Sequence, residues 1–183
     1  DKVRVYQVWN EPNDYFLKTN PAFHPSAPDA YVQLSRAVHD VVAELDPEAV
    51  VVVGGTAGQA IDFFRQVFAN GLLDYADVVS YHAYGEAEQG ALGASAFIPA
   101  VKRYHTMMTR SGGPLKPIWD CESGYSIDDG PGGLGPSMAM LQGIIARQAA
   151  GIERHYIYSG SPRHFTGQTN FHMIIGFDDR PLV

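Results

Sequence analysis

The sequence has 183 residues, of which 45% are apolar, and it carries a formal net charge of −7. That is enough apolar material for one domain with a sizeable core, whereas the negative charge argues against a nucleic-acid partner. No apolar run approaches the ~20 residues of a membrane-spanning helix, so no membrane partner is expected. The single cysteine, Cys121, excludes an internal disulfide and leaves the cellular compartment open.

Five short runs rich in apolar, β-branched and aromatic residues predict strands. In chain order they lie at residues 3–9, 50–53, 78–84, 117–121 and 155–158. The four consecutive valines at 50–53 are typical of a strand that is buried on both faces of a parallel sheet.

Helical patterns separate these strands. Between the first two, apolar residues recur every three or four positions from Tyr31 to Leu45, which places them on one face of a helix, and Pro47 ends it. Three more helices are predicted at about 59–69, at about 97–110, and after Gly135-Pro136. The alternation of strands and helices predicts an α/β fold with parallel strands.

Two architectures fit this alternation, an open doubly wound sheet and a (β/α)₈ barrel. An enzyme with an open sheet that binds a phosphate-bearing substrate is expected to have a glycine-rich phosphate loop after its first strand. Here residues 9–13 read Trp-Asn-Glu-Pro-Asn, without a glycine. Residues 54–58, Gly-Gly-Thr-Ala-Gly, lack both the lysine of a nucleotide-binding loop and the dinucleotide spacing, and we interpret them as a turn. These features favour the barrel.

A complete (β/α)₈ barrel has eight strands and typically ~250 residues. With five strands, residues 1–183 are expected to form the C-terminal portion of one barrel domain, strands four to eight, without an internal boundary. The first three strands and the last helix would then lie outside the sequence.

Two glutamates follow predicted strands at the end where barrel enzymes carry their chemistry. Glu11 comes just after the first strand and Glu122 just after the fourth. Hydrolysis of a glycosidic bond needs such a pair, because one carboxylic acid protonates the leaving oxygen while a second carboxylate attacks or stabilises the anomeric carbon. The alternative to a catalytic role, for either residue considered alone, is that of an ordinary loop glutamate in contact with solvent.

Three motifs carry a family resemblance. Residues 6–13, Tyr-Gln-Val-Trp-Asn-Glu-Pro-Asn, resemble the Asn-Glu-Pro signature at the fourth barrel strand of clan A glycoside hydrolases. Residues 118–125, Ile-Trp-Asp-Cys-Glu-Ser-Gly-Tyr, resemble the seventh strand, and residues 79–84, Val-Ser-Tyr-His-Ala-Tyr, resemble the sixth. The overall sequence looks most like the β-xylosidase and α-iduronidase family or cellulase-like members. The resemblance implies a retaining hydrolase of β-linked substrates, with Glu11 as acid/base and Glu122 as nucleophile.

Five further residues are candidates for substrate binding. Asn10 is expected to hold a sugar hydroxyl, and His82 and Tyr84 to flank the nucleophile on one face of their strand, with turn formation and core packing as the alternatives. The remaining candidates are aromatic residues that could form a sugar platform or pack in a loop, Tyr125 and Tyr158. Trp9 and Trp119 lie inside predicted strands, which favours core packing.

The expected partner is therefore a carbohydrate substrate, and the oligomeric state stays open. No cofactor and no catalytic metal are expected, because no two histidines have a metal-ligand spacing. The competing function is a non-catalytic carbohydrate-binding barrel, which would need neither glutamate.

Overall fold

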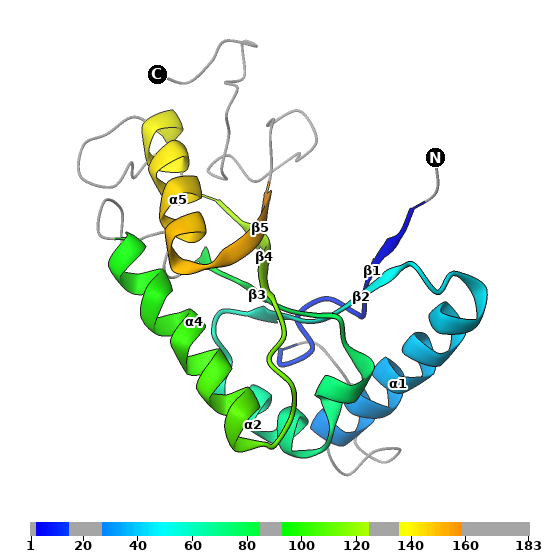
Figure 1. Ribbon diagram of the computed structural model, residues 1–183. Helices are drawn as coiled ribbons and strands as arrows, with labels where there is room; N and C mark the ends of the chain where they lie inside the picture. Colours follow the sequence, from blue (N-terminus) through cyan, green and yellow to red (C-terminus); the bar gives the residue numbers. More distant parts are fainter. Residues whose placement is uncertain (1–2, 15–26, 85–92, 125–135, 159–183) are drawn as a thin grey trace. The chain divides into compact units, whose positions relative to one another are not determined.

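The computed structural model describes residues 3–14, 27–84, 93–124 and 136–158 (Figure 1). In chain order, the helices and strands are β1 (Val5–Gln7), α1 (Ala27–Leu45), β2 (Val50–Ala57), α2 (Ile61–Ala69), the 3₁₀ helix η1 (Leu72–Tyr75), β3 (Val78–His82), α4 (Gly93–Arg110), β4 (Ile118–Ser123), α5 (Pro136–Ala150) and β5 (Ile152–Ile157). Each predicted strand and helix has a counterpart, and within the described residues η1 is the one element that was not predicted.

The five strands form one sheet in the order β1-β2-β3-β4-β5. β1 pairs with β2 in parallel, with Val5 opposite Val50, and β2 pairs with β3 in parallel, with Val52 opposite Val78. A doubly wound sheet reverses its strand order at a switch point, whereas a barrel keeps it sequential. The prediction of an α/β fold with the topology of a partial (β/α)₈ barrel is therefore confirmed.

The chain divides into two compact units, which are described separately. The first unit consists of residues 1–82 and 102–119, and the second of residues 83–101 and 120–183. Within the described ranges, no helix combines the length and the apolar character needed to cross a membrane.

An aromatic cluster forms part of the core of the first unit. Phe64 of α2, Tyr81 of β3 and Tyr104 of α4 are fully buried. The ring of Tyr104 lies 5.1 Å from that of Phe64 and 5.0 Å from that of Tyr81, between ring centroids. Such tilted and edge-on contacts add to the free energy gained from burial, and they fix α2 and α4 against β3.

The glycine-rich stretch after the second strand differs from its prediction as a turn. β2 continues through Ala57, and the pairing with β3 shifts register between Gly54 and Thr56, which marks a β-bulge. Gly54 has φ +95°, and a Cβ there would lie 2.3 Å from the carbonyl oxygen of Ser80. These glycines therefore permit the bulge and the close approach of β3, which a search for turn residues does not anticipate.

The two tryptophans also behave differently from each other. Trp119 is 4% exposed, as predicted for a core residue, whereas Trp9 is 52% exposed, so its core assignment is wrong. β1 ends at Gln7, and Trp9 lies in the following turn with φ +63°. The apolar run at 3–9 therefore contains residues of both a strand and a turn.

Candidate active site

Glu11 lies in a tight turn just beyond β1, in the first unit. Its φ is 48° and that of Trp9 is 63°, a left-handed conformation that residues other than glycine rarely adopt. Backbone hydrogen bonds to β2 hold the turn, from Val8 N to Val52 O (2.9 Å) and from Glu11 N to Gly55 O (2.8 Å). Surrounding contacts of this kind are what allows strained backbone to persist, and such strain often occurs at functional sites.

Side-chain amides reinforce the same turn. The Asn13 side chain continues the sheet, because its Nδ2 donates to Ala57 O (3.2 Å) and its Oδ1 accepts from Ala57 N (2.9 Å). Gln7 Nε2 donates to Trp9 O (3.0 Å). Both ends of the turn that contains Glu11 are therefore fixed by hydrogen bonds.

The hydroxyl of Tyr31, on α1, connects β2 to Val8, the residue that follows β1. It donates to Val8 O (2.9 Å) and accepts from Gly54 N (2.8 Å), and the residue is fully buried. Burial raises the pKa of Tyr31 well above its usual value, so the hydroxyl stays protonated and keeps both bonds.

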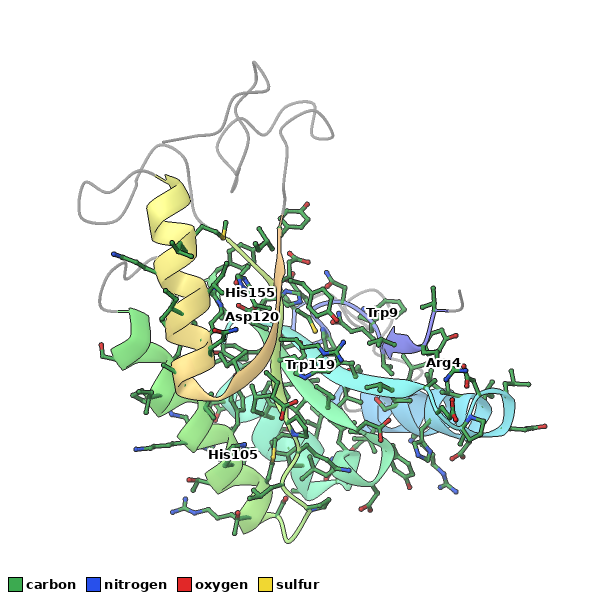
Figure 2. All side chains as sticks on the ribbon, turned by 45° about the horizontal axis from the view of Figure 1, so that its top comes forward. Arg4, Trp9, His105, Trp119, Asp120 and His155 are labelled. Carbon is green, nitrogen blue, oxygen red and sulfur yellow. The ribbon has the colours of Figure 1, made fainter. Side chains whose placement is uncertain are left out.

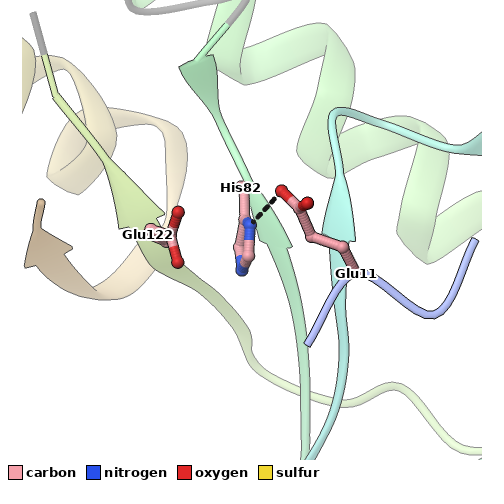
Figure 3. A group of neighbouring side chains, drawn as sticks. All are labelled: Glu11, His82 and Glu122. Atoms are coloured by element: carbon pink, nitrogen blue, oxygen red, sulfur yellow. Dashed lines mark hydrogen bonds and ion pairs between the residues drawn. The ribbon is translucent and has the colours of Figure 1, made fainter. Parts of the chain in front are cut away.

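His82, the last residue of β3, orients the Glu11 carboxylate. His82 Nδ1 lies 3.0 Å from Glu11 Oε1 (Figure 3). The His82 side chain is 1% exposed and that of Glu11 is 19% exposed, so the carboxylate keeps access to solvent. His82 Nε2 is buried and has no hydrogen-bond partner among the described residues.

Glu122, near the end of β4, has a phenol as partner within the second unit. The Tyr84 hydroxyl donates to Glu122 Oε1 (3.1 Å). Burial, followed by the negative charge of Glu122, raises the pKa of Tyr84 far above its usual value, with further contributions from Tyr158 and Asp120. Tyr84 therefore stays protonated and remains a hydrogen-bond donor. The end of β4 is also paired, because Tyr158 N donates to Ser123 O (3.0 Å).

A buried polar network lies beside Glu122 on β4. Asp120 and Arg147 have side chains that are 0% and 1% exposed, and Arg147 Nε donates to Asp120 Oδ2 (2.6 Å). Ser123 Oγ also donates to Asp120 Oδ2 and lies 3.1 Å from His155 Nε2. Figure 2 labels Asp120 and His155, whose side chains lie close together. Burial, and then the charge of Arg147, lower the pKa of His155 to about 4, so this histidine is neutral at neutral pH.

Four of the predicted site residues occur in two hydrogen-bonded pairs. Glu11 is paired with His82, and Glu122 with Tyr84. β3 ends at His82, so Tyr84 lies two residues beyond the strand that was predicted to include it.

The other three predicted residues have different positions. Tyr158 is half-buried just after β5 and close enough to Tyr84 to influence its pKa. Asn10 is exposed in the turn between Trp9 and Glu11. Tyr125 lies outside the described residues.

Sequence reasoning missed several residues that support the pairs, namely Asn13, Tyr31, Asp120, Ser123 and Arg147. Asp120 and Ser123 lie inside the motif that identified Glu122, and a charged residue within an otherwise apolar strand is a signal that could have found Asp120. Tyr31 and Arg147 occur in helical sequence, where nothing local indicates their role.

Comparison with known proteins gives structural matches only. No family model and no curated protein matches this sequence. A family 39 glycoside hydrolase from Bacteroides cellulosilyticus WH2 is similar with a TM-score of 0.68 and 18% identity, over 96% of this chain and 38% of its own. This chain shares its fold with glycoside hydrolases.

Two further structures agree with this result. A monomeric β-xylosidase from Caulobacter crescentus CB15 has a TM-score of 0.58 and 18% identity, over 96% of this chain and 38% of its own. A family 51 α-L-arabinofuranosidase from Bifidobacterium longum has a TM-score of 0.61 and 12% identity, over 85% of this chain and 39% of its own. The chain spans about two-fifths of the length of these structures.

Proposed function

We propose that the chain is part of a retaining O-glycoside hydrolase in which Glu122 is the nucleophile and Glu11 is the acid and base. The observation that carries the proposal is that each carboxylate has a partner from the end of β3 or just beyond it, His82 for Glu11 and Tyr84 for Glu122. Barrel enzymes carry their chemistry at the carboxyl ends of strands, where both glutamates occur. The fold shared with glycoside hydrolases supports the same activity.

Glu122 forms the covalent intermediate. One of its carboxylate oxygens bonds to the anomeric carbon of the sugar, and the bond from that carbon to the glycosidic oxygen breaks, leaving its electron pair on the oxygen. The Tyr84 hydroxyl donates to Oε1 of Glu122 and orients the carboxylate without neutralising its charge. This arrangement leaves Oε2 for the attack.

Glu11 moves the proton in both steps. Its carboxylic acid protonates the departing oxygen, and the resulting carboxylate then takes a proton from the water that attacks the anomeric carbon and releases Glu122. The contact with His82 suits both states, because an ionised Glu11 accepts from a protonated Nδ1 and a protonated Glu11 donates to a bare Nδ1.

The proposed substrate is a carbohydrate with an O-glycosidic bond. The clan A resemblance favours β-linked sugars. The similar structures include both a β-xylosidase and an α-L-arabinofuranosidase, so β-D-xylosides and α-L-arabinofuranosides are the first pair to compare.

The direct test is covalent labelling of the full-length protein with a 2-deoxy-2-fluoro glycoside that carries a dinitrophenyl leaving group. The fluorine slows breakdown of the glycosyl-enzyme, so intact mass should rise by one fluorosugar, and peptide mapping should place the sugar on Glu122. Glu122→Ala is the matched control and should not be labelled. Sugar binding without any labelling of the wild type would indicate a non-catalytic carbohydrate-binding protein and overturn the proposal.

A further inference from the structure

The Asp120 carboxylate is buried two residues before Glu122 and uses both of its oxygens. Oδ1 accepts from Ala83 N (3.2 Å), while Oδ2 accepts from Arg147 Nε (2.6 Å) and from Ser123 Oγ. A fully buried carboxylate is costly unless its charge and its lone pairs are matched in this way. All these contacts lie within the second unit.

These contacts join the two segments that form the pair of Tyr84 and Glu122. Ala83 precedes Tyr84, and Ser123 follows Glu122. We propose that Asp120, held by Arg147, is a positioning residue that fixes the Tyr84 hydroxyl against Glu122. The inference rests on the proposed function only in giving Glu122 the role of nucleophile.

Arg147 is the counter-ion that makes a buried aspartate possible here. Its guanidinium stacks over the Phe97 ring, 4.5 Å from the centroid, and its Nη2 donates to Ser123 Oγ (2.5 Å). The planar, five-donor guanidinium can bond Asp120 and Ser123 at the same time, which a lysine ammonium does less well. Arg147 therefore fixes the orientation of Asp120 as well as neutralising its charge.

The cluster contains serine, histidine and aspartate, yet its geometry does not fit a nucleophilic triad. In a triad the acid and the serine contact opposite nitrogens of the histidine. Here both Ser123 Oγ (3.1 Å) and Asp120 Oδ2 (3.6 Å) approach the same nitrogen, Nε2 of His155, and Ser123 is fully buried. Positioning of the neighbouring pair is the role that the geometry supports.

The test is a double-mutant cycle of Asp120→Asn and Tyr84→Phe in the full-length enzyme. The readout is kcat/KM for a dinitrophenyl glycoside, which reports formation of the glycosyl-enzyme. Asp120→Asn should lower it on the order of 10²-fold, as expected for a misplaced reacting group. In the Tyr84→Phe background, Asp120→Asn should cause almost no further loss, because residues that act through one another are not additive. Fully additive losses would overturn the inference.

Asp77→Asn is the matched control, because Asp77 also bonds strand backbone, through Oδ2 to Val51 N (2.8 Å), but in the first unit. Its effect on kcat/KM should be small and should add to that of Tyr84→Phe. If Asp120→Asn fails to fold, Ser123→Ala takes its place in the cycle, since it removes one bond to Asp120 without changing the charge.

A second readout does not depend on activity. In the wild type, the Tyr84 hydroxyl proton should give a downfield proton NMR signal, identified by its absence in Tyr84→Phe. Ser123→Ala should shift or broaden this signal, and Asp77→Asn should leave it in place. If the protein lacks glycosidase activity but the signal responds in this way, the proposed function falls and the positioning role stands. An unchanged signal in Ser123→Ala and Asp120→Asn would contradict positioning itself.

Discussion

The turn that carries Glu11 and the strand end that carries Glu122 are held by different kinds of interaction. Neutral backbone and amide hydrogen bonds fix the Glu11 turn, including the paired bonds of Asn13 to Ala57. Buried charges fix the Glu122 segment, through Asp120 and Arg147. Neutral hydrogen bonds contribute about 1 kcal/mol each, whereas leaving one member of a buried ion pair alone costs several. The Glu122 segment should therefore be far more sensitive to single substitutions and to pH.

The largest expected effect on stability is that of Arg147→Met. The substitution keeps much of the apolar volume but leaves the fully buried Asp120 without its counter-ion, which typically costs about 3–5 kcal/mol. Chemical denaturation of the full-length protein should show a loss of this size. The double variant Arg147→Met with Asp120→Leu should recover much of the stability, since no unpaired charge then remains. A loss below about 1 kcal/mol in the single variant would contradict the account of the buried pair.

The next effect concerns His155 and acid. Its folded-state pKa is about 4, against 6.5 in the unfolded chain. As the pH falls from 6.5 to 4, the unfolded state takes up a proton that the folded state does not, so stability is lost across this window and levels off below it. The lowered pKa corresponds to a loss of stability on the order of 3 kcal/mol.

The check is the free energy of unfolding of wild type and His155→Gln, compared at several pH values between 7 and 4. The variant should lose less stability than the wild type as the pH falls, because it lacks the titrating group. Parallel curves for the two proteins would mean that His155 does not carry the pH dependence.

The smallest effect is expected in the Glu11 turn. Asn13→Ala removes two neutral hydrogen bonds to Ala57, so it should cost about 1–2 kcal/mol and leave the pH dependence of stability unchanged. Thermal unfolding of the full-length protein measures the loss. Asn70→Ala, at the exposed end of α2, is a control for the loss of an asparagine side chain away from the turn. If Asn13→Ala and Asn70→Ala both changed the thermal stability by the same negligible amount, Asn13 would not hold the turn.

Much of this organisation could be predicted from the sequence. The strand order follows from alternating apolar runs and helical patterns, and Glu11 and Glu122 could be identified because they follow predicted strands and lie in recognisable motifs. What periodicity could not supply was the backbone detail, because the bulge at Gly54 and Gly55 depends on how closely β3 approaches. The same holds for Trp9, whose exposure depends on where β1 ends.

The supporting residues escaped prediction for a related reason. Arg147 pairs with Asp120 across 27 positions, and Tyr31 meets Gly54 across 23, and no local pattern encodes such contacts. A buried arginine on a helix resembles a solvated one until the partner is known. Tertiary structure was therefore needed to separate the residues that position the glutamates from ordinary helix residues.

The most direct test of the assigned roles uses azide and a dinitrophenyl glycoside with the full-length protein. Dinitrophenolate leaves without a proton, so Glu11→Ala should still form the glycosyl-enzyme, and azide should attack it without a base to give a glycosyl azide of retained configuration. Glu122→Ala lacks the nucleophile, so azide can only take its place and give the inverted glycosyl azide. The measurement is the anomeric configuration of each product by NMR. The account predicts retention for Glu11→Ala and inversion for Glu122→Ala; exchanged outcomes would contradict the assigned roles, and unchanged wild-type activity in both variants would contradict the glycosidase proposal itself.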